Sequence, residues 1–168
     1  GIVPSKKWKK EFLKESWYAG ETLNSAIGQG YSLSTPLQLA VMVGRIASNG
    51  KKIQPTIFKR KEKKQFDEIK IISEHFKLIK RAMFKVVNEQ GGTANYSLIN
   101  NQLLNKNDKY FFSGKTGTSQ VKKITAAERE SENFRKKEIE WKDKDHALFV
   151  GYMPSNIPKY AISVVVEH

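Results

Sequence analysis

The clearest helical pattern lies between residues 35 and 50. Apolar and small residues recur every three or four positions from Leu37 to Ala47, which places them on one face of a helix. Thr35 and Gln38 form a capping-box pair around the helix start, and Asn49-Gly50 is a typical helix stop. The pattern predicts a helix that begins at residue 36.

A second helix is predicted from Ser73 to the Gly91-Gly92 pair that stops it. Its apolar stripe consists of Phe76, Ile79, Met83 and Val86. Aromatic and Met residues at this spacing are typical of a packing face, so we assign the stripe to the core rather than to a cofactor site.

Residues 1–34 are rich in glycine, serine and aromatic residues without a clear period, which predicts an irregular region. Gly28-Gln29-Gly30 is predicted to form a tight backbone turn. Residues 51–72 are expected to form extended segments and turns, interrupted by a basic run at 59–64.

Three strands are predicted near the end of the chain, at residues 109–121, 147–153 and 160–166. The last two are apolar at both alternating sets of positions, which indicates a sheet covered on both sides. Only five residues join them, so they must form an antiparallel hairpin. The charged segment 122–145 separates the first two strands, and a solvated loop is favoured there over a flap on a cleft or a partner contact.

The 168 residues are typical of one domain, and the formal net charge is +13. Cysteine is absent, which excludes disulfides and thiolate metal sites, and the three histidines lack clustered carboxylates, so no metal site is expected. The basic residues are interpreted as a solvated face, because no nucleic-acid motif accompanies them. A nucleic-acid binder with steeply salt-dependent affinity remains an alternative.

Lys115-Thr116-Gly117-Thr118 is the candidate chemical motif. Lysine, hydroxyls and glycine together suit binding of a carboxylate beside a reacting carbonyl, and Lys-Thr-Gly is one of three signatures of penicillin-binding proteins and class A β-lactamases. On a strand, Lys115 and Gly117 face one way and the two threonines face the other. A bulge or a cleft edge would have to bring all four to one ligand.

Several segments in register with this motif resemble the transpeptidase domain of class B penicillin-binding proteins. They comprise residues 17–24, 27–31, 35–40, 92–94, 114–121 and 146–154. The opening residues 1–4, with Trp8-Lys9-Lys10, resemble the penicillin-binding protein 2 branch that acts in cell elongation. The chain begins at Gly1 rather than Met, which suggests that a segment precedes it.

The resemblance implies an α+β fold, with an antiparallel five-stranded sheet flanked by helices. Residues 1–168 would be the C-terminal portion of one transpeptidase domain and would supply the last three strands, with 122–145 as an insertion. It implies a D,D-transpeptidase that cross-links peptidoglycan stem peptides through a serine acyl-enzyme and is a target of β-lactams. No cofactor is implied.

The same resemblance assigns roles to the motif residues. Lys115 would organise proton transfer and attract the substrate carboxylate, which the hydroxyls of Thr116 and Thr118 would bind. The backbone N–H of Thr118 would form half of the oxyanion hole. Gly117 would let the strand approach the ligand closely.

The Ser-x-x-Lys and Ser-x-Asn motifs are absent in usable form, so the chain is expected to be inactive alone. Three textual matches begin at Ser48, Ser119 and Ser131, but none has the required structural context. His75 is expected to be exposed, and His146 to have a structural role. Gly92-Thr93-Ala94 could border the cleft, although a helix-ending turn explains it equally well.

The resemblance implies stem peptides and β-lactams as ligands. It also implies that the chain works with the N-terminal half of the same protein, a rod-shape scaffold protein and a polymerising glycosyltransferase, at the periplasmic face of the bacterial inner membrane. The anchoring helix would lie outside this segment. The alternative function is a catalytically inactive module of the same fold that acts as a sensor or scaffold; the retained Lys115-Thr116-Gly117-Thr118 argues against it.

Overall fold

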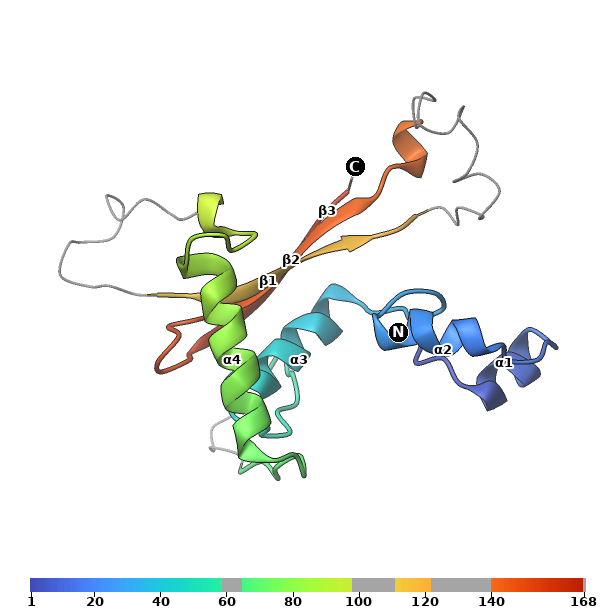
Figure 1. The fold of residues 1–168 in the computed structure, drawn as a ribbon. Coiled ribbons are helices and arrows are strands. Elements are labelled where there is room, and N and C mark those ends of the chain that lie inside the picture. The colour runs from blue at the N-terminus through green and yellow to red at the C-terminus, as the bar shows by residue number, and fades with distance from the viewer. Residues whose placement is uncertain (59–64, 98–110, 122–139, 168) are drawn as a thin grey trace. The chain divides into compact units, whose positions relative to one another are not determined.

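The computed structural model describes residues 1–58, 65–97, 111–121 and 140–167 (Figure 1). The helices are α1 (Lys6–Phe12), α2 (Ala19–Ala26), α3 (Pro36–Ala47) and α4 (Ser73–Asn88), with single 3-10 turns at Asn95–Ser97 and Trp141–Asp143. The strands are β1 (Ser113–Ser119), β2 (His146–Met153) and β3 (Tyr160–Val166). The chain divides into two compact units, residues 1–39 and 40–168, which we describe separately.

The first unit contains two helices where the sequence predicted irregular structure, so that prediction was wrong. Ser5 caps α1 by accepting a hydrogen bond from the Trp8 N–H at 3.1 Å. Both helices are short, seven and eight residues, so their apolar spacing spans too few turns to be read as a period. The predicted turn is present, because Gly28 and Gly30 both have positive φ.

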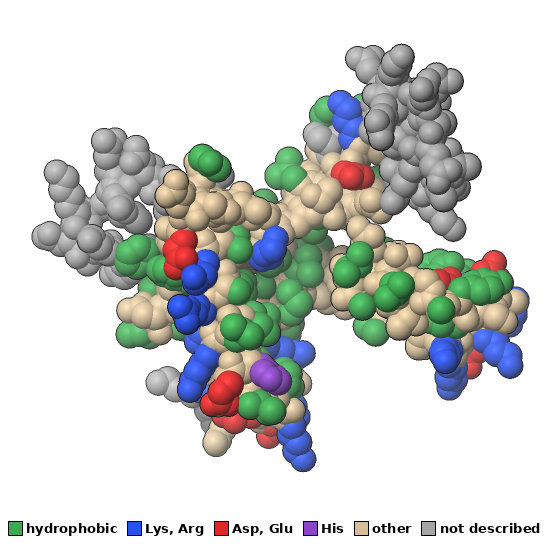
Figure 2. Space-filling view, viewed as in Figure 1, with side chains coloured by type: hydrophobic (Ala, Val, Ile, Leu, Met, Phe, Trp, Pro, Cys, Tyr) green, Lys and Arg blue, Asp and Glu red, His purple; other side chains and the backbone are tan. Residues whose placement is uncertain are grey.

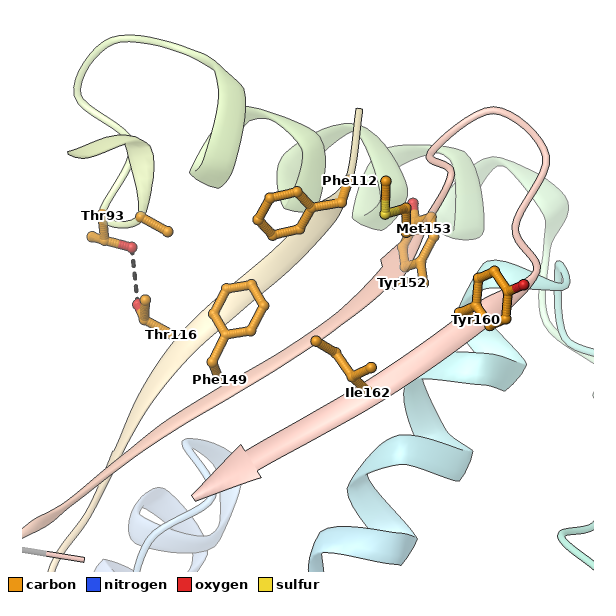
Figure 3. A pocket seen from close by; sticks show the side chains of 9 residues that line it. Thr93, Phe112, Thr116, Phe149, Tyr152, Met153, Tyr160 and Ile162 are labelled. Atoms are coloured by element: carbon orange, nitrogen blue, oxygen red, sulfur yellow. Dashed lines mark hydrogen bonds between the residues drawn. The ribbon is translucent and has the colours of Figure 1, made fainter. Parts of the chain in front are cut away.

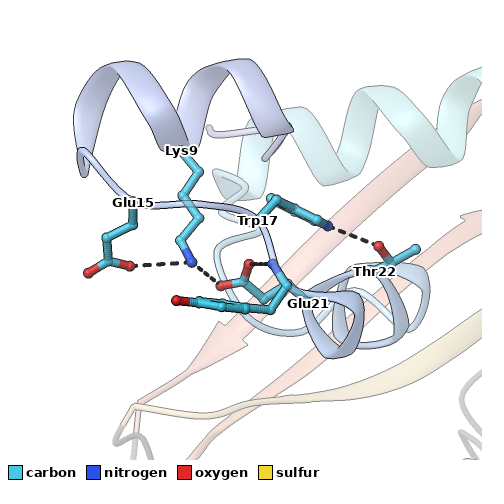
Figure 4. A network of polar contacts seen from close by, with 6 residues as sticks. Lys9, Glu15, Trp17, Glu21 and Thr22 are labelled. Carbon is cyan, nitrogen blue, oxygen red and sulfur yellow. Dashed lines mark hydrogen bonds and ion pairs between the residues drawn. The ribbon is translucent and has the colours of Figure 1, made fainter.

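An ion network centred on the buried Lys9 links α1 to α2 (Figure 4). Lys9 is only 1% exposed, and its Nζ lies 2.5 Å from Glu21 Oε1 and 3.3 Å from Glu15 Oε2. The other Glu21 oxygen accepts from the Tyr18 N–H at the start of α2, at 2.8 Å. The hydrogen bond to Glu21 raises the pKa of Lys9 above its ordinary value, so the ammonium stays charged although it is buried. These contacts supply the stability that short helices lack on their own.

The predicted start and end of α3 are confirmed. The Thr35 N–H donates to Gln38 Oε1 at 2.9 Å, and the Gln38 N–H donates to Thr35 Oγ1 at 3.2 Å, which completes the capping box. After the helix, Asn49 and Gly50 adopt positive φ of 57° and 90°. Ser48 therefore lies at a helix end, where the Ser-x-x-Lys arrangement of a nucleophile cannot form.

The second unit contains a three-stranded antiparallel sheet in the order β1-β2-β3. Ser113 pairs with Tyr152 and Ser119 with His146, and β2 continues to β3 through the predicted hairpin. The hairpin loop is tied to the start of β1, since the Ser155 N–H donates to the Phe111 carbonyl at 2.8 Å. β1 is shorter than the strand predicted at residues 109–121, because it runs only from Ser113 to Ser119. Residues 109 and 110 lie outside the described part.

Helices α3 and α4 pack on one face of this sheet. Val43 and Ala47 of α3, Met83 of α4 and Tyr152 of β2 form the buried cluster, with Val150 against it. Burial raises the pKa of Tyr152 above its ordinary value, so its hydroxyl stays neutral.

The buried face of α4 differs slightly from the predicted stripe. Phe76, Met83 and Val87 are buried, whereas Ile79 is 42% exposed and Val86 is only partly buried. Lysines and an arginine follow the outer side of α4, where Figure 2 shows them among acidic residues. Lys85 pairs with Glu89 at 3.0 Å there, and His75 is exposed as predicted. This helix thus carries a solvated face of mixed charge.

The opposite face of the sheet is open in the described part of the chain, so these residues supply a cover for only one of the two faces predicted to be covered. Ile162 is 47% exposed, Val164 44% and Val166 57%, all on this face by alternation. The apolar pattern of β3 requires a cover that the described residues do not supply. The basic run 59–64 and most of the charged segment, 122–139, lie outside the described residues.

Candidate active site

The Lys115-Thr116-Gly117-Thr118 motif lies in the middle of β1. Within the described residues, β1 is an edge strand that pairs only with β2. Lys115, Gly117 and Thr118 are exposed, and Thr116 is half-buried. The motif therefore lies along an open border of the sheet.

The lysine side chain bends around this border toward the next residue. Lys115 Nζ donates to the Thr116 carbonyl at 2.8 Å and to Thr116 Oγ1 at 3.3 Å. Alternation along the strand places the two side chains on opposite faces, yet the ammonium and the hydroxyl meet at the edge. The edge position thus brings the two groups together without a bulge.

Thr116 lines a pocket of about 620 Å³ on the open face of the sheet (Figure 3). The lining residues are Thr93, Ala94, Phe112, Thr116, Phe149, Tyr152, Met153, Tyr160 and Ile162. The pocket is mainly aromatic and aliphatic, with the two threonines together at one end. Lys115 does not line it but reaches its polar end through Thr116.

Thr93 is the residue whose importance the sequence left open. It follows α4 in the Gly92-Thr93-Ala94 turn, and its Oγ1 lies 2.9 Å from Thr116 Oγ1, with either hydroxyl able to donate. The turn itself needs glycine, because a Cβ at Gly92 would come within 2.5 Å of the Lys85 carbonyl oxygen. Both interpretations hold: the segment ends the helix, and it borders the pocket.

The backbone of Thr118 points toward the open border. The Thr116 carbonyl accepts from Lys115 Nζ, so its backbone groups face away from β2. In an antiparallel strand, residues two apart direct their N–H and C=O groups the same way. The Thr118 N–H is therefore directed toward the free edge of β1, on the same side as the lysine ammonium.

Gly117 has room for a side chain in this structure. A Cβ there would meet only Leu148 Cβ, at 3.6 Å, an ordinary contact. Packing among the described residues thus does not demand glycine at this position.

Other candidates from the sequence do not gather at this site. His146 opens β2 opposite Ser119, three pairs along the strand from Thr116. Ser131 and Lys122, which complete two of the textual motif matches, lie outside the described residues. No cluster of three or more potential metal ligands occurs among the residues the structure describes, and none of the helices described there is long and apolar enough to cross a membrane.

The sequence did not predict that the apolar residues of β2 and β3 line a pocket. Phe149, Tyr160 and Ile162 lie in strands whose composition indicated buried core. The mismatch between their apolar character and their place on an open face is visible only once the strand pairing is known.

Comparison with known proteins identifies the family. The penicillin binding protein transpeptidase domain family matches residues 4–168. The chain belongs to this family. It is 32% identical over its whole length to the peptidoglycan D,D-transpeptidase MrdA of Acinetobacter baumannii, and 30% identical over 99% of its length to that of Haemophilus influenzae. It spans 24% and 25% of those two proteins.

Solved structures agree with the sequence relatives. The chain matches penicillin-binding protein PBP2 of Helicobacter pylori, in its complex with MreC, with a TM-score of 0.77 and 31% identity, covering all of this chain and 27% of that one. It matches Pseudomonas aeruginosa PBP2 in complex with WCK 5153 with a TM-score of 0.67 and 30% identity, covering 99% of this chain and 33% of that one. The predicted α+β fold and the relationship to penicillin-binding protein 2 are confirmed.

Proposed function

We propose that this chain forms the Lys-Thr-Gly side of the active site in a serine D,D-transpeptidase that cross-links peptidoglycan stem peptides during cell elongation. The observation that carries the proposal is the Lys115 ammonium beside the Thr116 hydroxyl on an edge strand, at the polar end of a pocket. The family and the D,D-transpeptidase names of the relatives support the same reaction.

We propose a role for each motif residue, and the position of the motif on the edge strand supports these roles. Lys115 and the hydroxyls of Thr116 and Thr118 would attract and bind the carboxylate of a stem peptide or a β-lactam, because a cation and hydroxyl donors suit an anion. The Thr118 N–H would stabilise the oxyanion of the tetrahedral intermediate, a contribution of about 3 kcal/mol for one fixed donor. Gly117, which nothing in the described chain crowds, would leave space for the ligand to lie against the strand.

The attacking serine and its base would come from residues outside this segment, since the segment matches about a quarter of its relatives' length. The serine would attack D-Ala-D-Ala and release D-alanine, and the amine of a second stem peptide would then take the acyl group. β-Lactams would acylate the same serine. No cofactor is part of this proposal.

The cellular setting is proposed from the relatives. We place the full-length protein at the periplasmic face of the inner membrane, held by a helix outside this segment. A rod-shape scaffold protein is a proposed partner, because a related PBP2 was crystallised with MreC. A polymerising glycosyltransferase would supply the glycan strands to be cross-linked.

A fluorescent penicillin tests the proposal in the full-length protein. Lys115→Ala should slow acylation by about a hundredfold or more, as expected when one preorganised electrostatic contact is removed from an acyl-transfer site. Lys77→Ala is the matched control, because Lys77 is an exposed lysine on α4 whose contact with Glu74, at 3.9 Å, is a weak surface pair.

The outcomes separate the possible functions. Normal labelling of Lys115→Ala would contradict the role given to this lysine. A full-length protein that binds no penicillin and carries no Ser-x-x-Lys motif would be a catalytically inactive module instead.

A further inference from the structure

The Thr116 hydroxyl lies between two groups that come from different parts of the chain. Lys115 Nζ lies 3.3 Å away on the same strand, and Thr93 Oγ1 lies 2.9 Å away on the turn that follows α4 (Figure 3). The two threonines are 23 residues apart in sequence. Their contact is thus a tertiary feature and not a consequence of the local strand.

The numbers of donors and acceptors limit how Lys115, Thr116 and Thr93 can hydrogen-bond to one another. A hydroxyl has one hydrogen to donate and two lone pairs that accept, whereas an ammonium can only donate. Lys115 therefore occupies one lone pair of Thr116 Oγ1. If Thr93 donates to the second lone pair, the Thr116 hydrogen is left for a third partner.

An anion at the pocket's polar end would select that arrangement. A hydrogen bond to a carboxylate is stronger than one between two neutral hydroxyls, so the Thr116 hydrogen would turn to the anion. Thr93 would then have to act as the donor to Thr116. In this state Lys115 and Thr93 both donate to Thr116 Oγ1, and the Thr116 hydroxyl donates to the ligand.

The backbone around Thr93 is held firmly enough for this task. The Gly92 N–H donates to the Glu89 carbonyl and the Ala94 N–H to the Val86 carbonyl, both at 3.0 Å. Asn95 Nδ2 also donates to the Val87 carbonyl at 3.3 Å. These contacts thus fix the backbone of Thr93 relative to the C-terminal end of α4, although its side chain remains exposed.

We propose that Thr93 is a positioning residue that sets the Thr116 hydroxyl as a hydrogen-bond donor to the ligand carboxylate. This inference rests on the proposed transpeptidase function. It makes the end of α4 part of carboxylate recognition, in addition to the Lys-Thr-Gly strand. Thr93 acts through Thr116 and does not itself touch the ligand.

The test uses two substrates with the full-length protein: benzylpenicillin, which carries the carboxylate, and its methyl ester, in which that group is uncharged. Thr93→Val keeps the shape of the side chain and removes the hydroxyl. It should slow acylation by benzylpenicillin about tenfold, the effect of one hydrogen bond of ordinary net strength, while the rate with the neutral ester changes by less than about twofold. Thr93→Ser keeps the hydroxyl and should restore most of the rate with benzylpenicillin.

Thermal unfolding of each variant shows whether the fold is retained, and Thr93→Ala provides a second variant with the same expected selectivity. Equal slowing with both compounds would mean a merely structural role and would overturn the proposal. Unchanged rates in Thr93→Val would overturn it as well. If the wild-type protein and Lys115→Ala are acylated alike, the proposed function of the motif fails instead, and the inference fails with it.

Discussion

Phe149 shows how a single side chain shapes the strand that carries the motif. Its ring lies over two glycines that face each other across the sheet, Gly114 of β1 and Gly151 of β2. A Cβ at Gly151 would lie 2.9 Å from the ring, and one at Gly114 would lie even closer to it. These glycines are therefore needed for packing, unlike Gly117 three positions further along β1.

The two glycines of β1 give a matched pair of substitutions. Gly114→Ala should lower the free energy of unfolding by about 1–3 kcal/mol, because the new methyl group overpacks against the Phe149 ring. Gly117→Ala should leave stability within about 0.5 kcal/mol, since its Cβ meets only Leu148, at 3.6 Å. Denaturant unfolding of the full-length protein measures the stability change of each variant.

Acylation rates test whether Gly117 has a role in ligand binding. If Gly117 serves the ligand, Gly117→Ala should slow acylation by a penicillin although the fold is intact. A Gly117→Ala protein that is destabilised as much as Gly114→Ala would contradict the packing difference. One that acylates at the wild-type rate would contradict the role of Gly117.

The sequence alone singles out Lys115, Thr116 and Thr118 as candidates, because they stand together within four consecutive positions. It could not predict how Lys115 reaches Thr116, since alternation alone places them on opposite faces. The answer depends on β1 being an edge strand, which is a property of the whole sheet. The contact of Thr93 with Thr116 could not be predicted either, because 23 residues separate the two and only tertiary structure brings them together.

At the scale of elements, α4 is connected directly to the strand that carries the motif. Asn88, at the end of α4, donates through Nδ2 to the Phe84 carbonyl at 2.8 Å and to the Phe112 carbonyl at 2.9 Å. The rings of Phe84 and Phe111 also pack at 5.5 Å between centroids. The helix end thus fixes the entry of β1 as well as the turn that holds Thr93.

Replacing Asn88 should loosen this connection. Asn88→Ala removes the donor from two carbonyls in a partly buried position, so we expect a loss of about 1–3 kcal/mol in unfolding free energy. Asn88→Asp, which keeps the size but replaces the donor with an acceptor, should be at least as harmful. Arg81→Ala, an exposed position on the same helix, is the control and should change stability by less than about 0.5 kcal/mol. Equal stability of Asn88→Ala and Arg81→Ala would refute the connection.

The sequence predicted some helices and missed others, and the lengths and contacts of the helices explain why. α3 and α4 were predicted because they are 12 and 16 residues long, so that caps and apolar spacing repeat over several turns. α1 and α2 were missed because each is held largely by the contacts of Lys9 and Glu21, which are distant in sequence. The hairpin of β2 and β3 was predicted because its short loop permits only one topology.

At the scale of the whole molecule, the main unexplained feature is that apolar side chains are exposed on the open face of the sheet. Tyr160, Ile162 and Val164 of β3 are 70%, 47% and 44% exposed, although strands of this composition are usually buried. The chain spans about a quarter of the length of the curated relatives it matches, and we infer that polypeptide outside this segment covers this face. The segment should therefore depend on that polypeptide for cooperative folding.

A comparison of the isolated segment with the full-length protein tests this dependence. Residues 1–168 alone should unfold in a broad transition and bind a hydrophobic dye, whereas the full-length protein should unfold sharply and bind little dye. Val164→Thr sharpens the test, because it adds a hydroxyl at a position that is 44% exposed in the described structure. In the full-length protein a buried hydroxyl without a partner should cost about 1–3 kcal/mol, whereas dye binding by the isolated segment should hardly change. A sharp transition without dye binding in the segment alone, or a Val164→Thr substitution without effect in the full-length protein, would show that this face needs no cover.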